Sequence, residues 1–296
     1  MAELGVMIEA QEGLTWKLWR AIAETADRLG FAALRTSDHC QSVMGVDRPS
    51  LSAWPALNLA ADWTHRIQLG TMVSPLTFYQ PAVLARIARA ADELSGGRVI
   101  LGVGAGWNEA EHERFGIPLP PWSERFHNLE AGVERIRQTL QDHPLPLLIG
   151  GGGERRTLPL AARVAAEWNL HTTDAGLVAA KSAVLAERCR DISRDPAEIR
   201  RSVMTGCLLG RDRSELRTRA ERLSRILPSL AGLPPDEVLE AYAEKALVGT
   251  PAEIVEQVRP LAAAGVQLFM FQHFLLDDSE ALELMASEVA PAIASF

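Results

Sequence analysis

The chain alternates between short apolar runs and longer stretches in which apolar residues recur at helical spacing. The apolar runs predict strands at residues 4–9, 31–36, 67–73, 99–103, 145–150, 167–171, 202–210 and 266–271. The longer stretches predict helices at residues 15–30, 54–64, 81–94, 123–140, 155–166, 175–190, 214–226, 251–264 and 278–286. Because the strands are continuous apolar runs, we expect both of their faces to be covered, as in parallel sheets.

Eight strands, each followed by a helix, predict an α/β fold of the (β/α)8 TIM-barrel type with insertion loops at its C-terminal face. A doubly wound open sheet is the alternative, because the pattern alone does not prove closure. No linker divides the chain, so we expect a single domain over residues 1–296. Three connections are longer than a barrel needs, at residues 37–53, 104–122 and 227–248. The first two follow strands and therefore lie at the C-terminal face, where barrel sites form.

Composition and charge narrow the class of protein. Hydrophobic residues make up 47% and charged residues 23%, which excludes a mainly disordered chain. The formal net charge of −8 disfavours general nucleic-acid binding. No apolar run is long enough for a membrane span, and residues 1–6 have no signal-peptide pattern. Three scattered cysteines predict no disulfide framework and no metal site, so a cytoplasmic protein is expected.

Polar residues follow seven of the eight predicted strands, and this convergence indicates an enzyme. They are Glu9, Ser37-Asp38-His39, Ser74, the 104–109 stretch with Asn108 and Glu109, the 150–157 stretch, His171-Thr172-Thr173, and Gln272-His273. Asp38 and His39 form either a proton-handling pair or a positioning pair. Since neighbours on an extended strand point to opposite sides, we expect one of the two to be structural.

Two glycine-rich stretches are candidates for ligand binding. Gly150, Gly151, Gly152 and Gly153 lie between a strand and a helix, where free backbone N–H groups would hold an anion with help from Arg155 or Arg156. A flexible turn is the alternative interpretation. The second stretch, GVGAG at 102–106, lacks the third glycine of a dinucleotide fingerprint. There we expect the glycines to let the backbone approach a flat ligand, with Trp107 lining the pocket.

Glu109, His112 and Glu113 resemble half of a carboxylate metal motif. The second half is absent, so we expect a solvated helix face and no metal.

Several segments together resemble the luciferase-like monooxygenase family, in particular the branch that uses the deazaflavin coenzyme F420. They are GVMIEAQEGLTW, SDH at 37–39, LGTMVSPLTFYQPAVLARIAR, LSGGRVILGVGAGWNEAEHERFGIP, ERFHNLEAGVERI, IGGGGERRTLPLAARVAAEWN and VGTPAEIVEQVRPLAAAGVQLFMF. The resemblance covers nearly the whole chain. It implies a barrel that binds a flavin or deazaflavin at its C-terminal face, acts on a small-molecule substrate and forms a homodimer.

The resemblance also implies roles for single residues. A non-prolyl cis peptide would join Met72 and Val73 behind the coenzyme ring. Asp38 and His39 match the family's ring-proximal motif, and His39 is the candidate proton donor or acceptor. The other coenzyme contacts implied or expected at this stage are Gly106, Trp107, Asn108, and, at the phosphate, Gly151, Gly152 and Gly153.

This chain departs from the family pattern at two places. Trp107 stands near a position that is acidic in some deazaflavin dehydrogenases, which argues against a sugar-phosphate dehydrogenase. Only a few residues around His143-Pro144 separate the fourth helix from the fifth strand, where many relatives carry a longer segment.

Three hypotheses follow for the activity. The first is F420-dependent hydride transfer to or from a small organic substrate. The second is an FMN-dependent monooxygenase with a separate flavin reductase, and the third is a non-catalytic flavin-binding barrel.

Overall fold

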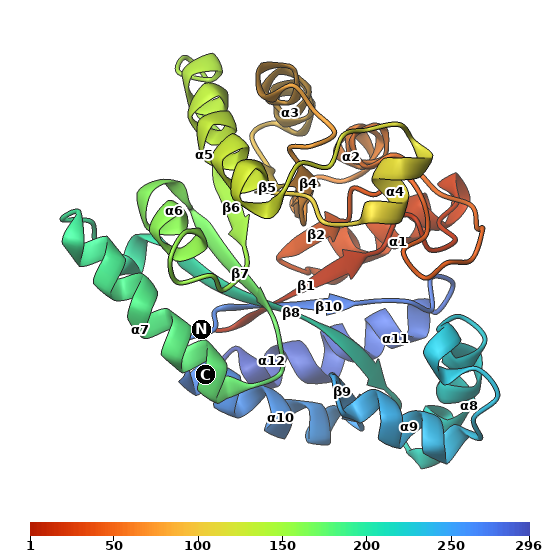
Figure 1. The fold of residues 1–296 in the computed structure, drawn as a ribbon. Coiled ribbons are helices and arrows are strands. Elements are labelled where there is room, and N and C mark those ends of the chain that lie inside the picture. Colours follow the sequence, from red (N-terminus) through yellow and green to blue (C-terminus); the bar gives the residue numbers. More distant parts are fainter.

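The computed structural model describes residues 1–296 and confirms the predicted (β/α)8 barrel (Figure 1). The ring closes because β10 (Leu268–Gln272) pairs in parallel with both β1 (Glu3–Ile8) and β8 (Arg200–Leu209). Between β1 and β8 the order is β2 (Ala33–Thr36), β3 (Gln68–Thr71), β5 (Val99–Gly104), β6 (Leu147–Gly150) and β7 (Glu167–His171). This closure excludes the open sheet.

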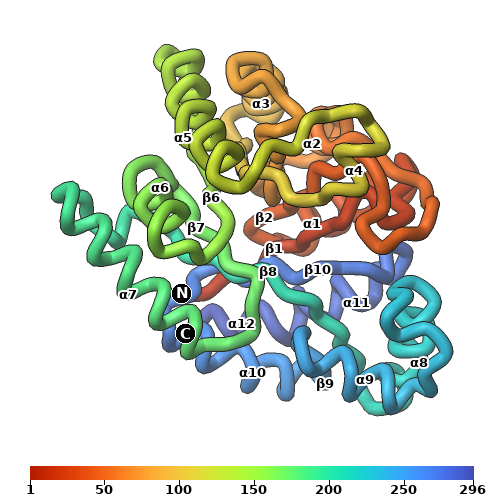
Figure 2. The backbone as a smooth tube through the Cα atoms, viewed as in Figure 1, coloured from red at the N-terminus to blue at the C-terminus, as the bar shows by residue number.

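Two short strands accompany the ring. β4 (Ser74–Pro75) continues the direction of β3 beside β5, after an interruption at Met72 and Val73. β9 (Ala246–Gly249) pairs with the far end of β8. It begins at the end of the 227–248 connection and reaches Gly249, and no strand was predicted there (Figure 2).

Helices surround the strands (Figure 1). All the predicted ones are present, with ends shifted by a few residues: α1 (Trp16–Leu29), α2 (Ala53–Trp63), α3 (Pro81–Ser95), α5 (Trp122–Thr139), α6 (Thr157–Val164), α7 (Ala175–Asp191), α8 (Arg213–Ser224), α10 (Pro251–Ala263) and α11 (Ser279–Leu284). Sequence signals set several of the ends. Thr15 caps α1 by accepting a hydrogen bond from the Leu18 amide, and Gly30 ends it with φ 83°.

Several short elements were not predicted. They are α9 (Pro235–Ala243), α12 (Ala290–Ile293), the 3-10 turns Pro196–Glu198 and Pro228–Leu230, and the π turn Met285–Val289, which begins within the predicted helix 278–286. The short helix α4 (Glu109–Arg114) carries the helix face that was expected at Glu109, His112 and Glu113, although its bounds were not predicted. Each is too short to show a sustained period in the sequence. α4 and α9 lie in two of the long connections.

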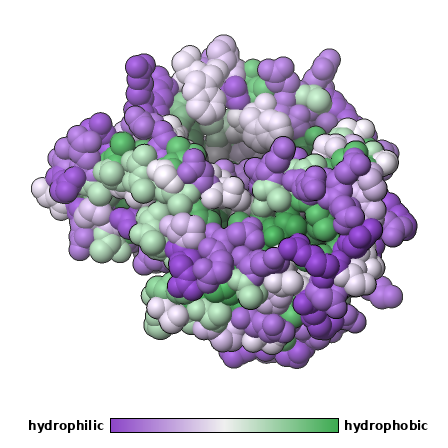
Figure 3. All heavy atoms as spheres, turned by 90° about the horizontal axis from the view of Figure 1, so that it is seen from below, coloured by the Kyte–Doolittle hydropathy of each residue, from purple (hydrophilic) through white to green (hydrophobic).

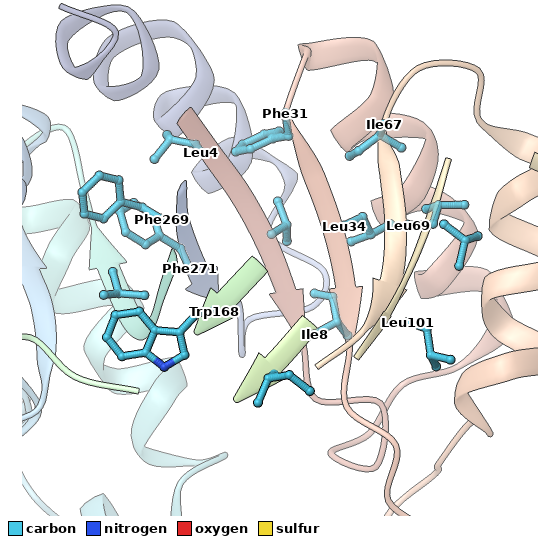
Figure 4. Close-up of a cluster of buried hydrophobic side chains, with 14 of the residues drawn as sticks. Leu4, Ile8, Phe31, Leu34, Ile67, Leu69, Leu101, Trp168, Phe269 and Phe271 are labelled. Atoms are coloured by element: carbon cyan, nitrogen blue, oxygen red, sulfur yellow. The ribbon is translucent and has the colours of Figure 1, made fainter. Parts of the chain in front are cut away.

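Apolar side chains are buried on both faces of the ring. Outward-facing residues such as Leu4, Ile8, Leu34 and Phe269 pack against the helices in the main core (Figure 4). Inward-facing residues form a second cluster of seven: Met7, Ala33, Met72, Ile100, Leu148, Leu268 and Met270. Burial of both faces is the reason that the strands appear as unbroken apolar runs.

The barrel interior also holds a buried ion pair. Arg35 of β2 and Glu167 of β7 lie 3.5 Å apart, Nη2 to Oε2, and both side chains are almost completely buried. Arg35 also donates to the Gln68 backbone carbonyl (3.0 Å), and Glu167 accepts from the Ser202 hydroxyl (2.7 Å). Opposite charges and hydrogen bonds are what make such burial tolerable.

The surface is largely hydrophilic on the face seen in Figure 3, with smaller hydrophobic patches among the polar residues. No helix is both long enough and apolar enough to span a lipid bilayer.

We expect Glu167→Ala to lower the free energy of unfolding by about 3–5 kcal/mol, because it leaves the buried charge of Arg35 without its partner. The free energy of unfolding should fall much less in the double variant Arg35→Met/Glu167→Met, since it removes both charges. Urea denaturation measures the difference, and Glu24→Ala, which breaks the exposed Arg20–Glu24 pair, is the control. Equal losses in the single and double variants would contradict the assignment.

Candidate active site

A cavity of about 530 Å³ lies at the carboxyl ends of the strands. Every strand of the ring contributes to its lining, through Glu9, Ser37, Met72, Gly104, Gly150, His171, Met204 and Gln272. Glu9 and Gln272 lie two residues beyond the interior residues Met7 and Met270. Because strand residues two apart share a face, they continue the barrel interior into the cavity.

The walls of the cavity come from two of the predicted long connections. His39, Val43 and Met44 belong to the loop after β2. The connection after β5 supplies Ala105, Gly106, Trp107, Asn108, Glu111, His112 and Trp122. Both connections therefore have the position expected from the sequence.

His39 faces the cavity and is held by a carboxylate from α4. Its Nδ1 lies 2.8 Å from Oε2 of Glu111, which is fully buried and also accepts a hydrogen bond from the Cys40 amide. Burial by itself lowers the pKa of His39, but Glu111, with the charges of Glu9 and Asp38, outweighs it, so that this pKa lies above the usual value. The Nε2 atom makes no hydrogen bond within the protein and is the atom available to a ligand.

Asp38 does not line the cavity. Its carboxylate accepts hydrogen bonds from the Ser74 hydroxyl (2.5 Å) and the Tyr79 hydroxyl (3.1 Å). Burial raises the pKa of Asp38, while these two hydrogen bonds oppose the rise. Of the Asp38-His39 pair, Asp38 is thus the structural member that the extended backbone led us to expect. Its predicted contact with a coenzyme has no support from this geometry.

The peptide bond between Met72 and Val73 is cis, as the family resemblance implied. Both residues line the cavity. A Cβ atom on Gly104 would lie 2.6 Å from Cγ2 of Val73, and one on Gly102 or Gly106 would overlap Thr71 or Thr77. The glycines of the 102–106 stretch therefore let β5 approach the β3–β4 segment. That is a different reason from the close ligand approach that we expected.

The remaining residues predicted after β5 all line the cavity. Trp107 is 62% exposed, and its ring meets that of His39 edge-on, with centroids 5.7 Å apart. Asn108 caps α4 by accepting a hydrogen bond from the Glu111 amide. Gly106 has φ 74°, and its carbonyl accepts a hydrogen bond from Arg125.

The glycine run lies beside the cavity, which Gly150 lines. The Gly151 amide donates to the Asn169 carbonyl (2.9 Å), so Gly151 contributes its backbone conformation (φ 109°) rather than a free N–H. The amides of residues 152–156 make no hydrogen bond within the protein. Lys181 lies next to Gly152, with its ammonium 2.8 Å from Glu154. Arg156 donates to the Ser123 carbonyl (3.1 Å). This arrangement fits an anion at the Gly152–Gly153 amides.

Sequence reasoning missed Glu111 and underestimated His112. Glu109 and Glu113 are exposed as expected, but His112 is buried and bridges the Asn108 carbonyl (2.6 Å) and the Thr77 hydroxyl (2.8 Å). Only part of this helix face is therefore solvated. No cluster of three His, Cys, Asp or Glu side chains is arranged to hold a metal ion.

Comparison with known proteins identifies the family of this chain. The model for "luciferase-like monooxygenase" matches residues 1–268. An F420-dependent glucose-6-phosphate dehydrogenase of Intrasporangium calvum is 33% identical over 167 residues, which are 47% of this chain and 48% of that protein. The match thus spans about half the length of that relative.

A second such dehydrogenase, from Nocardia farcinica, is 29% identical over 319 residues, covering 92% of each chain. That alignment has more positions than this chain's 296 residues, so the relative carries extra residues within it.

Solved structures share the fold. An F420-dependent secondary alcohol dehydrogenase in complex with an F420-acetone adduct has a TM-score of 0.81 at 17% identity, covering 99% of each chain. The long-chain alkane monooxygenase LadA has a TM-score of 0.80 at 14% identity, covering 99% of this chain and 91% of that chain. With the match of the family model over residues 1–268, the chain belongs to the luciferase-like monooxygenase family.

Proposed function

We propose that this protein is an oxidoreductase that binds coenzyme F420 in the 530 Å³ cavity and transfers a hydride between it and a small organic substrate. The observation that carries the proposal is His39, which faces the cavity with Nε2 free while the buried Glu111 holds Nδ1. The names of the relatives from I. calvum and N. farcinica support F420 as the coenzyme.

The residues present fit such a coenzyme. The cavity has the size of a ligand pocket, and the cis peptide at Met72–Val73 forms part of its wall. Met72, Val73, Gly106, Trp107 and Asn108 would contact the ring. The free amides of Gly152 and Gly153, with Lys181 and Arg156 nearby, would hold the phosphate.

The bound coenzyme supplies the hydride chemistry, and the chain supplies binding, orientation and a proton. His39 exchanges that proton at Nε2 with the substrate oxygen, in whichever direction the hydride moves. Glu111 fixes the orientation of the ring and stabilises its protonated form. Asp38 holds Ser74 and Tyr79 behind this arrangement and takes no part in proton exchange.

FMN is the alternative coenzyme, because the Gly152–Gly153 amides suit a single phosphate equally well. With FMN the protein would be a monooxygenase supplied by a separate flavin reductase. If the protein binds FMN tightly and does not bind F420, the FMN-dependent alternative is established. Binding of either coenzyme without turnover of any substrate would indicate a non-catalytic barrel.

The proposal extends to location and assembly. We infer a cytoplasmic homodimer, on the basis of the family resemblance and of three cysteines that form no disulfide. Light scattering of the purified protein measures the assembly.

The first test is a coenzyme titration with Gly152→Val. A Cβ atom at Gly152 would lie 3.1 Å from Leu170 Cδ2 and 3.6 Å from Lys181 Cε, so the larger valine side chain must displace the loop or Lys181. We expect the dissociation constant for F420 to rise about tenfold. Binding of the same deazaflavin without its phosphate-bearing side chain should not change. Equal weakening for both ligands would show that the loop does not bind phosphate.

The second test is His39→Ala. Loss of a proton-exchanging residue should lower kcat about 100-fold or more, while the dissociation constant for F420 changes less than about threefold. Absorbance of the coenzyme reports turnover on a panel of alcohols, aldehydes and hydroxy acids. His65→Ala, on the surface away from the cavity, is the matched control. An equal loss of turnover and coenzyme affinity would remove His39 from its proposed role.

The third test is Glu111→Gln, followed by the NMR titration of His39. Without the carboxylate charge, burial dominates, and we expect the pKa of His39 to fall toward or below 6.5. Because the wild-type pKa is raised on folding, the stabilisation from this pair is complete below about pH 6.5 and is lost as the pH rises through the folded-state pKa. Glu113→Gln, exposed on the same helix, should leave the titration unchanged. An unshifted pKa in Glu111→Gln would contradict the pairing.

A further inference from the structure

A second cavity, of about 460 Å³, adjoins the first. The two share four lining residues: Met44, His171, Gln272 and Phe274. A molecule in the second cavity therefore has one end beside the proposed coenzyme. The outer wall comes from the 227–248 connection, the third long connection and the one for which the sequence suggested no ligand.

Most of this wall is apolar. Met44, Leu227, Pro228, Ala246 and Phe274 line it. The wall is also anchored to the loop after β2, since Arg48 of that loop donates to the Ile226 carbonyl (2.5 Å) and pairs with Glu12 (3.4 Å). These contacts of Arg48 hold the 227–248 connection against the loop after β2.

One hydroxyl group that lines this cavity makes no hydrogen bond with the protein. Tyr242 of α9 is 3% exposed, and its hydroxyl makes no hydrogen bond with the protein. The hydroxyl lies directly over Gly206, where a Cβ atom would collide with it. Burial raises the pKa of Tyr242, so the hydroxyl keeps its proton and is a donor. This donor opens to the cavity and is available to an acceptor on a ligand.

One positively charged side chain lines this cavity. Lys245 is exposed, forms no ion pair and is the only Lys, Arg, Asp or Glu in the lining. It follows Tyr242 by three residues at the end of α9, where its amide donates to the Tyr242 carbonyl (3.2 Å). Both residues line the same cavity, so the Tyr242 hydroxyl and the Lys245 ammonium are both available to a ligand there.

We propose that the second cavity binds the substrate as an apolar carboxylic acid, with the carboxylate at Tyr242 and Lys245 and the reacting end toward His39. Only the placement of the reacting end toward His39 rests on the proposed function. A sugar phosphate fits less well, because its hydroxyls need polar partners. Apart from Tyr242 and Lys245, only His171, Ser229 and Gln272 offer polar side chains, and the remaining lining is mainly apolar. The substrate class therefore differs from that in the names of the dehydrogenase relatives.

Calorimetry on the coenzyme-free protein tests the carboxylate preference with octanoate, octanamide and glucose 6-phosphate. Octanoate and octanamide have the same apolar chain and differ in charge. We expect octanoate to bind about tenfold more tightly than octanamide, and glucose 6-phosphate to bind most weakly. Octanamide binding as tightly as octanoate, or glucose 6-phosphate binding more tightly, would overturn the proposal.

Two variants locate the carboxylate. Tyr242→Phe should weaken octanoate about tenfold, and Lys245→Met about fivefold at low salt, with a smaller effect at high salt. Octanamide affinity should not change in Lys245→Met. Lys17→Met, on the exposed side of α1, is the matched control. Circular dichroism confirms folding of each variant. Unchanged octanoate affinity in both folded variants would overturn the proposal.

The F420 titration separates this inference from the proposed function. If F420 does not bind while both variants weaken octanoate binding, the coenzyme assignment is wrong and the proposed carboxylate site is supported. If F420 binds and both variants bind octanoate as tightly as the wild type does, only the proposed carboxylate site is contradicted.

Discussion

Closure of the strand ring through β10 is the constraint on which the remaining structure depends. Because β10 pairs with both β1 and β8, no strand can rotate without exposing its apolar outer face or breaking two ladders. The inward and outward residues are thereby fixed around the whole ring. Two residues beyond the last packed interior layer, the same alternation places Glu9 and Gln272 in the cavity. The floor of the site is thus a consequence of barrel packing.

A second constraint fixes the His39 side chain. Glu111 is fully buried, and a buried carboxylate needs hydrogen-bond donors or an opposite charge. His39 and the Cys40 amide meet that need, so the loop after β2 and helix α4 stabilise one another. Proton chemistry at His39 and the position of α4 are therefore coupled. A change at Glu111 should therefore affect the site even if Glu111 touches no ligand.

The sequence predicted the fold more fully than the site. Continuous apolar runs such as 99–103, repeated between helical stretches, are typical of parallel strands buried on both faces. His39 was identifiable because it follows a strand directly. Glu111 was not, because α4 has too few residues to show which side is buried. The 102–106 glycines were expected to let the backbone approach a ligand, whereas the atoms that lie too close for a side chain belong to Thr71, Val73 and Thr77. Such contacts between distant segments leave no local signal.

The strand ends and the connections of this barrel contribute different parts of the site. Strand ends supply the floor of the site, which is set by barrel packing. The connections supply the walls: α4 brings Glu111, and the 227–248 segment brings Tyr242 and Lys245. Met44 and Phe274 line both cavities, so a substitution at either residue alters the coenzyme and substrate pockets together. Substitutions at Leu227 or Ser229 reach only the second cavity. Specificity can therefore change at the 227–248 segment without disturbing the residues that handle the proton.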